Sequence, residues 1–343
     1  MNKRLDKVRW WEYLGFGGVF MAVLCLCVCV GSVNIPLSET VTVISNALLR
    51  QPQPEGLAPA IILTVRLPRV LCVALTGAAL SLAGAAMQGL LKNPLADGST
   101  LGVSSGAALG AVIAIAFGLN FSAVPFAGTM IMAILFALGS LLIILGLAYK
   151  LDYSLATNTI ILIGVIYSMF VSSAMSIIVT FAADKVQQIT FWTMGSLQGS
   201  SYENAAVLAA VLLVCGGVLL ASAQELNAFA VGEDNARHIG VNVRRTKLVV
   251  LITVSVLIGV CVSIGGTIAF VGLVTPHMVR MIVGPNHRRL LPASLFGGAV
   301  FLLLADLAAR ILLNPQELPI GVVTSLVGAV VFVFIFYNTR KGQ

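Results

Sequence analysis

Charged side chains are scarce in this sequence: Asp, Glu, Lys and Arg together make up 10% of its 343 residues. Soluble globular domains average about 25%. Disordered segments are rich in charge and poor in apolar residues, whereas 59% of the residues here are hydrophobic. The composition therefore excludes an ordinary soluble enzyme, a disordered chain and a nucleic-acid-binding protein, and it indicates an integral membrane protein.

Residues that could bind a metal ion or a nucleotide are also few. The three histidines, His238, His277 and His287, are not at metal-ligand spacing, and the sequence has no G-x-x-x-x-G-K-[ST] phosphate loop. All six cysteines fall within apolar segments, where they predict helix packing and neither disulfides nor a metal site. We therefore expect no catalytic residues, no resident metal and no cofactor.

Acidic residues inside the membrane are scarcer still. Of the thirteen Asp and Glu residues, only Asp306 falls well within an apolar segment. A proton- or sodium-coupled carrier usually keeps several ionisable groups near the middle of the membrane. If the chain is a transporter, we therefore expect its energy to come from another protein. An ion-coupled secondary transporter remains the alternative of a different class.

Charges and turn residues divide the chain into ten apolar segments, each near the ~20 residues that a membrane-spanning helix needs. These segments are 13–33, 70–91, 99–119, 124–149, 159–183, 205–223, 248–266, 267–284, 290–313 and 318–337. Gly265-Gly266 predicts a hairpin between the seventh and eighth segments, because a single helix over 248–284 would be far longer than the membrane is thick. We expect an all-α polytopic membrane protein with ten transmembrane helices in one domain over 1–343.

The stretch before the second span has its own signals. Leu57–Val65 is too short to span a membrane, and Arg66 follows it directly. We expect this stretch to lie outside the membrane or in its interface. Pro68 disfavours a helical conformation at the preceding residue, which predicts that the second helix begins just after it. The first span is longer than the apolar part of a secretory signal, so we expect it to remain uncleaved.

The basic residues orient the spans. With both termini in the cytoplasm, fifteen of the twenty Lys and Arg residues lie in cytoplasmic segments or at cytoplasmic ends of spans, which the positive-inside rule favours. Three on the outer side, Arg66, Arg69 and Arg310, form a candidate dock for acidic groups of an external protein, because arginine binds carboxylates in bidentate pairs. The alternatives are snorkelling at the membrane interface and, for Arg310, an ion pair with Asp306 four residues earlier.

The loop between the sixth and seventh spans, 224–247, contains the sequence GEDNARHIG. Acidic residues at its start, basic residues later and a closing glycine predict a short helix with a defined end. Its candidate contact residues are Gly232, Glu233, Asp234, Ala236, Arg237, Ile239 and Gly240. A cytoplasmic motor could push on such a helix, with Ala236 and Ile239 available for contact. A connector without a partner is the alternative.

Hydroxyl side chains recur on one face of the fifth span. The candidate path residues there are Ser168, Met169, Ser172, Ser173, Ser176 and Thr180. Hydrogen bonds to helix carbonyls or between helices would explain the pattern. The alternative is a mildly polar wall of a translocation path, which suits a large chelated substrate better than a bare cation. Small residues at every fourth position of the second span, from Gly77 to Gly89, predict close helix packing.

Several long stretches of the sequence together resemble a known protein family. They read RLPRVLCVALTGAALSLAGAAMQGLLKNPLADGSTLGVSSGAALG at Arg66–Gly110, then GGTIAFVGLVTPHMVR, NHRRLLPASLFGGA and LLLAD within Gly265–Asp306, and ELPIGVVTSLVGAVVF at Glu317–Phe332. Together with GEDNARHIGVNV, these stretches strongly resemble the FecCD family of ABC importer permeases, which serve ferric siderophores, haem and cobalamin.

The resemblance implies the type II ABC importer permease fold and a homodimer with one translocation path at its two-fold interface. It places the chain in the cytoplasmic (inner) membrane of a bacterium, surrounded by lipid. Two ATP-hydrolysing subunits would bind below and a substrate-binding protein above, so the chain itself would not be an enzyme. We expect a ferric siderophore as the cargo, carried by alternating access. Haem and cobalamin are the alternatives.

The resemblance also implies roles for the three candidate sites. In the family, arginines at the outer mouth grip glutamates of the binding protein, and the matching positions are Arg66, Arg69 and Arg310. The segment Gly232–Gly240 matches the coupling helices, which sit in a cleft of the ATPase. Residues of the fifth span line the path in related permeases.

Overall fold

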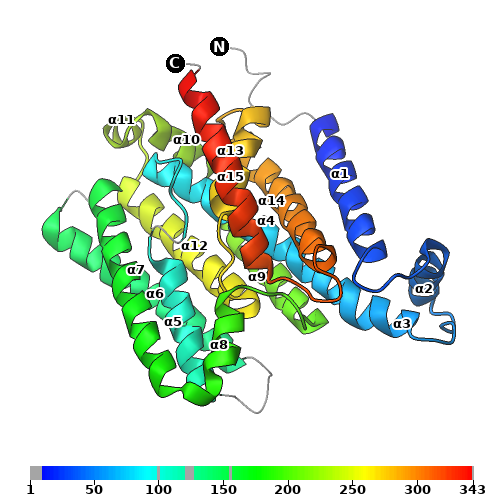
Figure 1. Cartoon of the computed structure of the whole chain (residues 1–343). Coiled ribbons are helices and arrows are strands. Elements are labelled where there is room, and N and C mark those ends of the chain that lie inside the picture. The colour runs from blue at the N-terminus through cyan, green and yellow to red at the C-terminus, as the bar shows by residue number, and fades with distance from the viewer. Residues whose placement is uncertain (1–9, 99–100, 120–126, 154–156, 342–343) are drawn as a thin grey trace.

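The computed structural model describes residues 10–98, 101–119, 127–153 and 157–341, which form helices joined by turns, with no strand among them (Figure 1). A helix occurs at each expected span: α1 (Trp10–Cys29), α4 (Leu67–Leu91), α5 (Val103–Ala116), α6 (Ala127–Leu151), α7 (Thr157–Phe181), α9 (Tyr202–Ala221), α12 (Val243–Gly265), α13 (Val271–Val283), α14 (His287–Ile311) and α15 (Ile320–Lys341). The all-α prediction is confirmed. Seven helices of the described part are long and apolar enough to cross a membrane, whereas α5, α13 and the apolar part of α15 are shorter. The count of ten spans is therefore approximate.

The second span begins earlier than expected. α3 (Ala58–Ala60), the π-helical turn η2 (Ile61–Arg66) and α4 join into one helix of 34 residues. The expectation that the helix begins just after Pro68 is therefore wrong, whereas the placement of Leu57–Val65 outside the membrane or in its interface stays a prediction.

The π-helical turn explains how this helix accommodates its proline. The N–H of Leu67 donates to the carbonyl of Ile62, five residues back. In the same register Pro68, which has no N–H, would face the carbonyl of Leu63. The hydroxyl of Tyr202, in the first turn of α9, donates to that carbonyl at 2.6 Å. The missing backbone bond is thus replaced from a neighbouring helix.

Five shorter helices were not among the expected spans. They are α2 (Leu37–Leu49), the 3-10 turn η3 (Ala183–Lys185), α8 (Val186–Thr193), α10 (Ala223–Val231) and α11 (Glu233–His238). α10 and α11 lie at the end of the bundle where α1 begins and α15 finishes, whereas α2 and α8 lie toward the opposite end (Figure 1). After the orientation that the basic residues predict, we call these the inner end and the outer end.

Small residues let α4 pack at the centre of the bundle. A Cβ atom at Gly77 would lie 2.3 Å from the carbonyl oxygen of Gly298 in α14, and one at Gly84 would lie 1.9 Å from that of Gly272 in α13. Neither position has room for a side chain, so the expected close packing is confirmed. By contrast, only 22% of the most apolar part of α7 is buried, so a broad face of this helix is not covered by other helices of the described chain.

Candidate functional site

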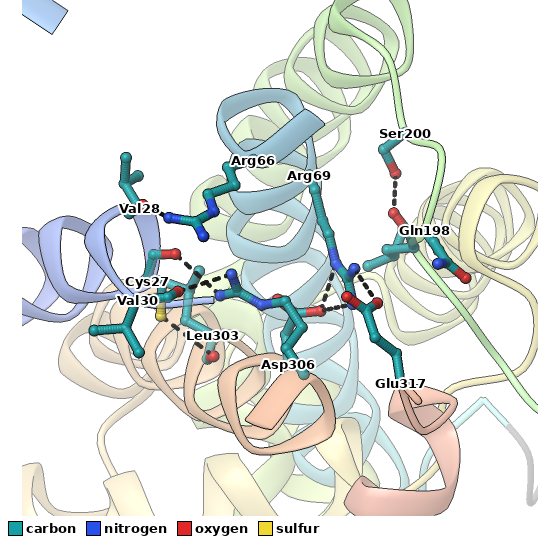
Figure 2. A network of polar contacts seen from close by, with 12 residues as sticks. Cys27, Val28, Val30, Arg66, Arg69, Gln198, Ser200, Leu303, Asp306 and Glu317 are labelled. Atoms are coloured by element: carbon teal, nitrogen blue, oxygen red, sulfur yellow. Dashed lines mark hydrogen bonds and ion pairs between the residues drawn. The ribbon is translucent and has the colours of Figure 1, made fainter. Parts of the chain in front are cut away.

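Five charged side chains gather at the outer end, where α4 and α14 meet the end of α1 and the turn before α15 (Figure 2). This outer charged cluster consists of Arg66, Arg69, Asp306, Arg310 and Glu317. Arg69 donates to Asp306 Oδ1 at 2.9 Å and to Glu317 Oε2 at 2.6 Å. The Nε atom of Arg310 lies 2.9 Å from Asp306 Oδ2, but without hydrogen-bond alignment. Asp306 is therefore shared between two arginines from different helices.

Two arginines of the cluster also bind carbonyl groups of the last turn of α1 and of the residues that follow it. Arg310 donates to two of them, both at 3.0 Å, and Arg66 donates to three others. The accepting residues are Cys27 and Val30 for Arg310, and Val28, Cys29 and Val33 for Arg66. The final carbonyls of a helix have no partners within it and carry its negative dipole end, which favours cations there.

The outer charged cluster is buried. The exposed fractions are 5% for Arg66, 7% for Arg69, 3% for Arg310 and 0% for Asp306. The expected Asp306–Arg310 ion pair is confirmed, and the snorkelling alternative is wrong, because these guanidinium groups point into the protein. Docking of an external protein on the three arginines stays a prediction. Each of them is already held by groups of this chain.

At the inner end, the predicted short helix is present as α11. Glu233 and Asp234 are in its first turn and Arg237 and His238 in its last. Beyond it, the N–H of Gly240 donates to the carbonyl of Arg237 at 3.0 Å, and that of Val241 donates to Ala236 at 2.9 Å. Gly240 has a φ of +92°. These two bonds and the left-handed glycine are a Schellman motif, as the sequence GEDNARHIG predicts.

α11 is fixed to the bundle on one side and open on the other. Glu233 forms an ion pair with Lys247 of α12 at 2.8 Å. Ala236 is fully buried, so the expectation that it is available to a partner is wrong. Ile239, the residue that follows the helix, is 71% exposed. The small side chain at position 236 lets α11 pack closely against the rest of the chain. Ile239 is then the apolar residue that remains available to a partner protein.

A second attachment of the inner end was not predicted. Asn227 of α10 accepts from the backbone N–H of His287 at 2.8 Å, pairs with the His287 Nδ1 at 2.9 Å and donates to Asn286 at 2.9 Å. Asn286 is also the N-cap of α14, donated to by Arg288. We call Asn227, Asn286 and His287 the α10–α14 joint. The N-cap was readable from the sequence Asn-His-Arg-Arg, whereas its partner 59 residues away was not.

Four of the five candidate hydroxyl groups of α7 have partners within the protein. Ser173, Ser176 and Thr180 each donate to the carbonyl four residues earlier, at 2.8–3.1 Å. Ser168 bonds Ser105 of α5 at 3.1 Å. The explanation by back-bonding and interhelical bonds is therefore confirmed. Ser172, Ser173, Ser176, Thr180 and Met169 lie on the exposed face of α7, and a role in a translocation path stays a prediction.

Comparisons with known proteins agree with this architecture. The profile of the FecCD transport family matches residues 19–338. The chain is 39% identical over 342 residues to the "uncharacterized ABC transporter permease protein YvrB" of Bacillus subtilis, covering 99% of this chain and 97% of that one. It is also 39% identical to the cobalamin import system permease protein BtuC of Halobacterium salinarum, over 81% of this chain and 73% of the relative.

A solved structure shares the fold. It is described as a metal-chelate type ABC transporter in an inward-facing conformation, and it matches with a TM-score of 0.82 and 32% identity over 95% of this chain and 98% of the other. Such permeases are the multi-pass membrane components of ABC transporters. The chain is therefore a member of the FecCD transport family, an ABC importer permease.

Proposed function

We propose that this chain is one half of a homodimeric permease for a metal chelate, with a ferric siderophore as the cargo. Two ATPase subunits bind at the inner end, which faces the cytoplasm with both termini, and a substrate-binding protein docks at the outer end. The observation that carries the proposal is α11. It is a short, well-terminated helix that is followed by an exposed isoleucine and is held to α12 by the Glu233–Lys247 ion pair.

The attachments of α11 give the coupling a physical route. ATP binding draws the two ATPases together and displaces α11. The Glu233–Lys247 pair passes this movement to the first turn of α12, and α10 passes it to α14 through the α10–α14 joint. The spans then rearrange at the dimer interface, where the open face of α7 lines the path. Hydrolysis and release reset the arrangement.

The coupling role is tested by Ile239→Asp in proteoliposomes that contain the chain, its ATPase and its binding protein. A charge at this exposed apolar contact should abolish most uptake while the chain still folds. The matched control is Leu48→Asp, because Leu48 is also an exposed apolar residue, on α2 at the outer end. Equal uptake by both variants would show that Ile239 does not contact the ATPase.

The docking role has a test that avoids unfolding the protein. Glu317 is the most accessible carboxylate of the outer charged cluster, with 17% of its side chain exposed, and it occupies one side of Arg69. If carboxylates of the binding protein take this place, Glu317→Gln should tighten binding severalfold by removing the internal competitor. Glu203→Gln is the control, since Glu203 is an exposed carboxylate of α9 at the same end. Unchanged binding by Glu317→Gln would contradict docking on Arg69.

Cargo and energy source are tested in the same proteoliposomes. Uptake of a labelled ferric siderophore is compared with uptake of haemin and cobalamin, and saturable, ATP-dependent uptake of the siderophore alone is expected. Transport by the isolated chain on an ion gradient would instead support a secondary transporter. Orientation is tested by Ile239→Cys, which an impermeant maleimide should label only after cells are permeabilised.

A further inference from the structure

A cavity of about 600 Å³ opens at the inner end between α6, α7, α11 and α12. Ligand sites in proteins usually have volumes of about 300–1,000 Å³. The outer charged cluster does not contribute to it, and α7 contributes Ile160 but none of its hydroxyl-bearing candidate residues. Leu142 and Leu248 of its lining are 69% and 40% exposed, so the cavity opens onto the apolar surface of the bundle.

The wall from α6 is a single helical face. Leu142, Leu145, Gly146 and Tyr149 line the cavity, and their spacing of three, four and seven residues puts them in one row. α6 runs toward the inner end and finishes at Leu151. The row therefore passes from leucines farther from the inner end, of which Leu142 is 69% exposed, to a tyrosine at the mouth, over about 10 Å at ~1.5 Å per residue.

The wall from α12 repeats this gradient in the opposite chain direction. Arg244, Lys247, Leu248 and Leu251 line the cavity with the same spacing. α12 starts at the inner end with Val243, so its basic residues lie at the mouth and its leucines deep. Two antiparallel helices thus present apolar side chains to the same inner slot and polar, cationic ones to its opening.

The charges at the mouth leave a net positive group. Lys247 is paired with Glu233 at 2.8 Å, and Arg237 with Asp234 at 3.2 Å. Arg244 forms no ion pair with any residue that the structure describes, and it is exposed. The ring of Tyr149 packs edge-on against that of Tyr153 at 4.8 Å between centroids. Tyrosine is favoured at the level of lipid headgroups because its ring is apolar and its hydroxyl polar.

We propose that this cavity binds an anionic phospholipid, with an acyl chain along the leucines and the phosphate at Arg244. Basic pockets between membrane helices on the cytoplasmic side select anionic headgroups. The leucine slot favours a source with a hydrocarbon tail over a free phosphate ion. A zwitterionic lipid would fill the slot but would leave Arg244 without a net counter-charge. The lipid lies against α11, since Glu233 and Arg237 also line the cavity.

Two pairs of variants test the headgroup contact and the acyl-chain contact of the lipid separately. Arg244→Gln removes the proposed phosphate contact, and Arg245→Gln is its control, because Arg245 is the next residue, also exposed, and does not line the cavity. Gly146→Phe fills the slot. Gly139→Phe is the control two turns earlier on α6. A Cβ at either glycine meets no atom within 4 Å, so both positions have room for the start of a side chain.

The test uses the purified full-length chain in detergent with photoactivatable phosphatidylglycerol or phosphatidylcholine, and peptide mass spectrometry locates the label. Phosphatidylglycerol should label the segments 142–153 and 243–251, and phosphatidylcholine should label them far less. Arg244→Gln should reduce this preference about fivefold, the contribution typical of one basic residue near an anionic surface, and Gly146→Phe should abolish the labelling. The two controls should retain it.

Three results would overturn the proposal. They are equal labelling by the two lipids, equal losses in variants and controls, or displacement of the lipid by excess inorganic phosphate, which would assign the site to a free anion. Thermal unfolding of each variant shows whether it is folded. If Arg244→Gln is not folded, Gly146→Phe and its control Gly139→Phe still test the site. No ATPase or binding protein is present, so the outcome does not depend on the transport proposal.

Discussion

The two ends of the molecule use charge in opposite ways. At the outer end, Arg69 and Asp306 are 237 residues apart in the sequence, meet at 2.9 Å and are almost fully buried. At the inner end, Arg237 and Asp234 are three residues apart on one short helix, and their side chains are 59% and 88% exposed. The first pair joins two membrane helices. The second adds little to the fold and leaves its helix accessible.

This contrast assigns different tasks to the two ends. A buried charge that loses its partner is costly, so the outer charged cluster resists separation of α1, α4, α14 and α15. Exposed pairs in water are worth about 0–1 kcal/mol, so α11 can exchange its surface contacts for those of a partner at little cost. Glu233–Lys247, the α10–α14 joint and buried apolar side chains such as Ala236 and Phe229 keep α11 and α10 attached while that happens.

The largest effect is expected from Asp306→Ala. Two buried arginines would lose their shared carboxylate, and breaking a buried pair costs about 3–5 kcal/mol. The chain should show a much lower unfolding temperature in detergent, or should fail to accumulate in the membrane. Asp306→Asn should be milder, because the amide still accepts a hydrogen bond from Arg69. If Asp306→Ala lowered the unfolding temperature no more than the substitution of an exposed acidic residue does, the shared-carboxylate arrangement would be contradicted.

An intermediate effect is expected from Asn227→Ala in the α10–α14 joint. The backbone N–H and Nδ1 of His287, which is 5% exposed, would lose their acceptor, and an unsatisfied buried polar group costs about 1–3 kcal/mol. We expect a moderate drop in the unfolding temperature and more ATP hydrolysed per molecule transported, measured in the reconstituted complex. Asn235→Ala is the control. The side chain of Asn235, in α11, is exposed and donates only to the carbonyl of Val231, the last residue of α10. If both variants keep the wild-type ratio, the joint does not transmit movement.

The two ends also differ in how far the sequence could predict them. α11 could be predicted from local signals within the nine residues GEDNARHIG. The acidic residues at its start, the basic residues at its end and the glycine that follows all act through neighbouring backbone groups. The outer charged cluster depends on which helices are adjacent. The i,i+4 pair of Asp306 and Arg310 was readable, but the second partner of Asp306, Arg69, comes from a helix far away in the sequence.

The errors at the start of α4 and at Ala236 have the same origin. A proline normally marks the start of a helix, but here a hydroxyl from α9 takes the place of the missing backbone bond. An alanine on a short amphipathic helix is equally suited to an outer or an inner face. In both cases a contact from another part of the fold decides the outcome, and such contacts have no local signature.

The smallest effect is expected from Asp234→Asn. The substitution removes the ion pair with Arg237 but leaves an N-terminal side chain that still accepts hydrogen bonds. Because both groups are mostly exposed, the free energy of unfolding should change by less than about 1 kcal/mol, and the change should shrink further in high salt. Thermal unfolding at low and high ionic strength measures this. A large, salt-resistant loss would mean that the pair at the inner end holds the fold as the outer charged cluster does, and the distinction between the two ends would fail.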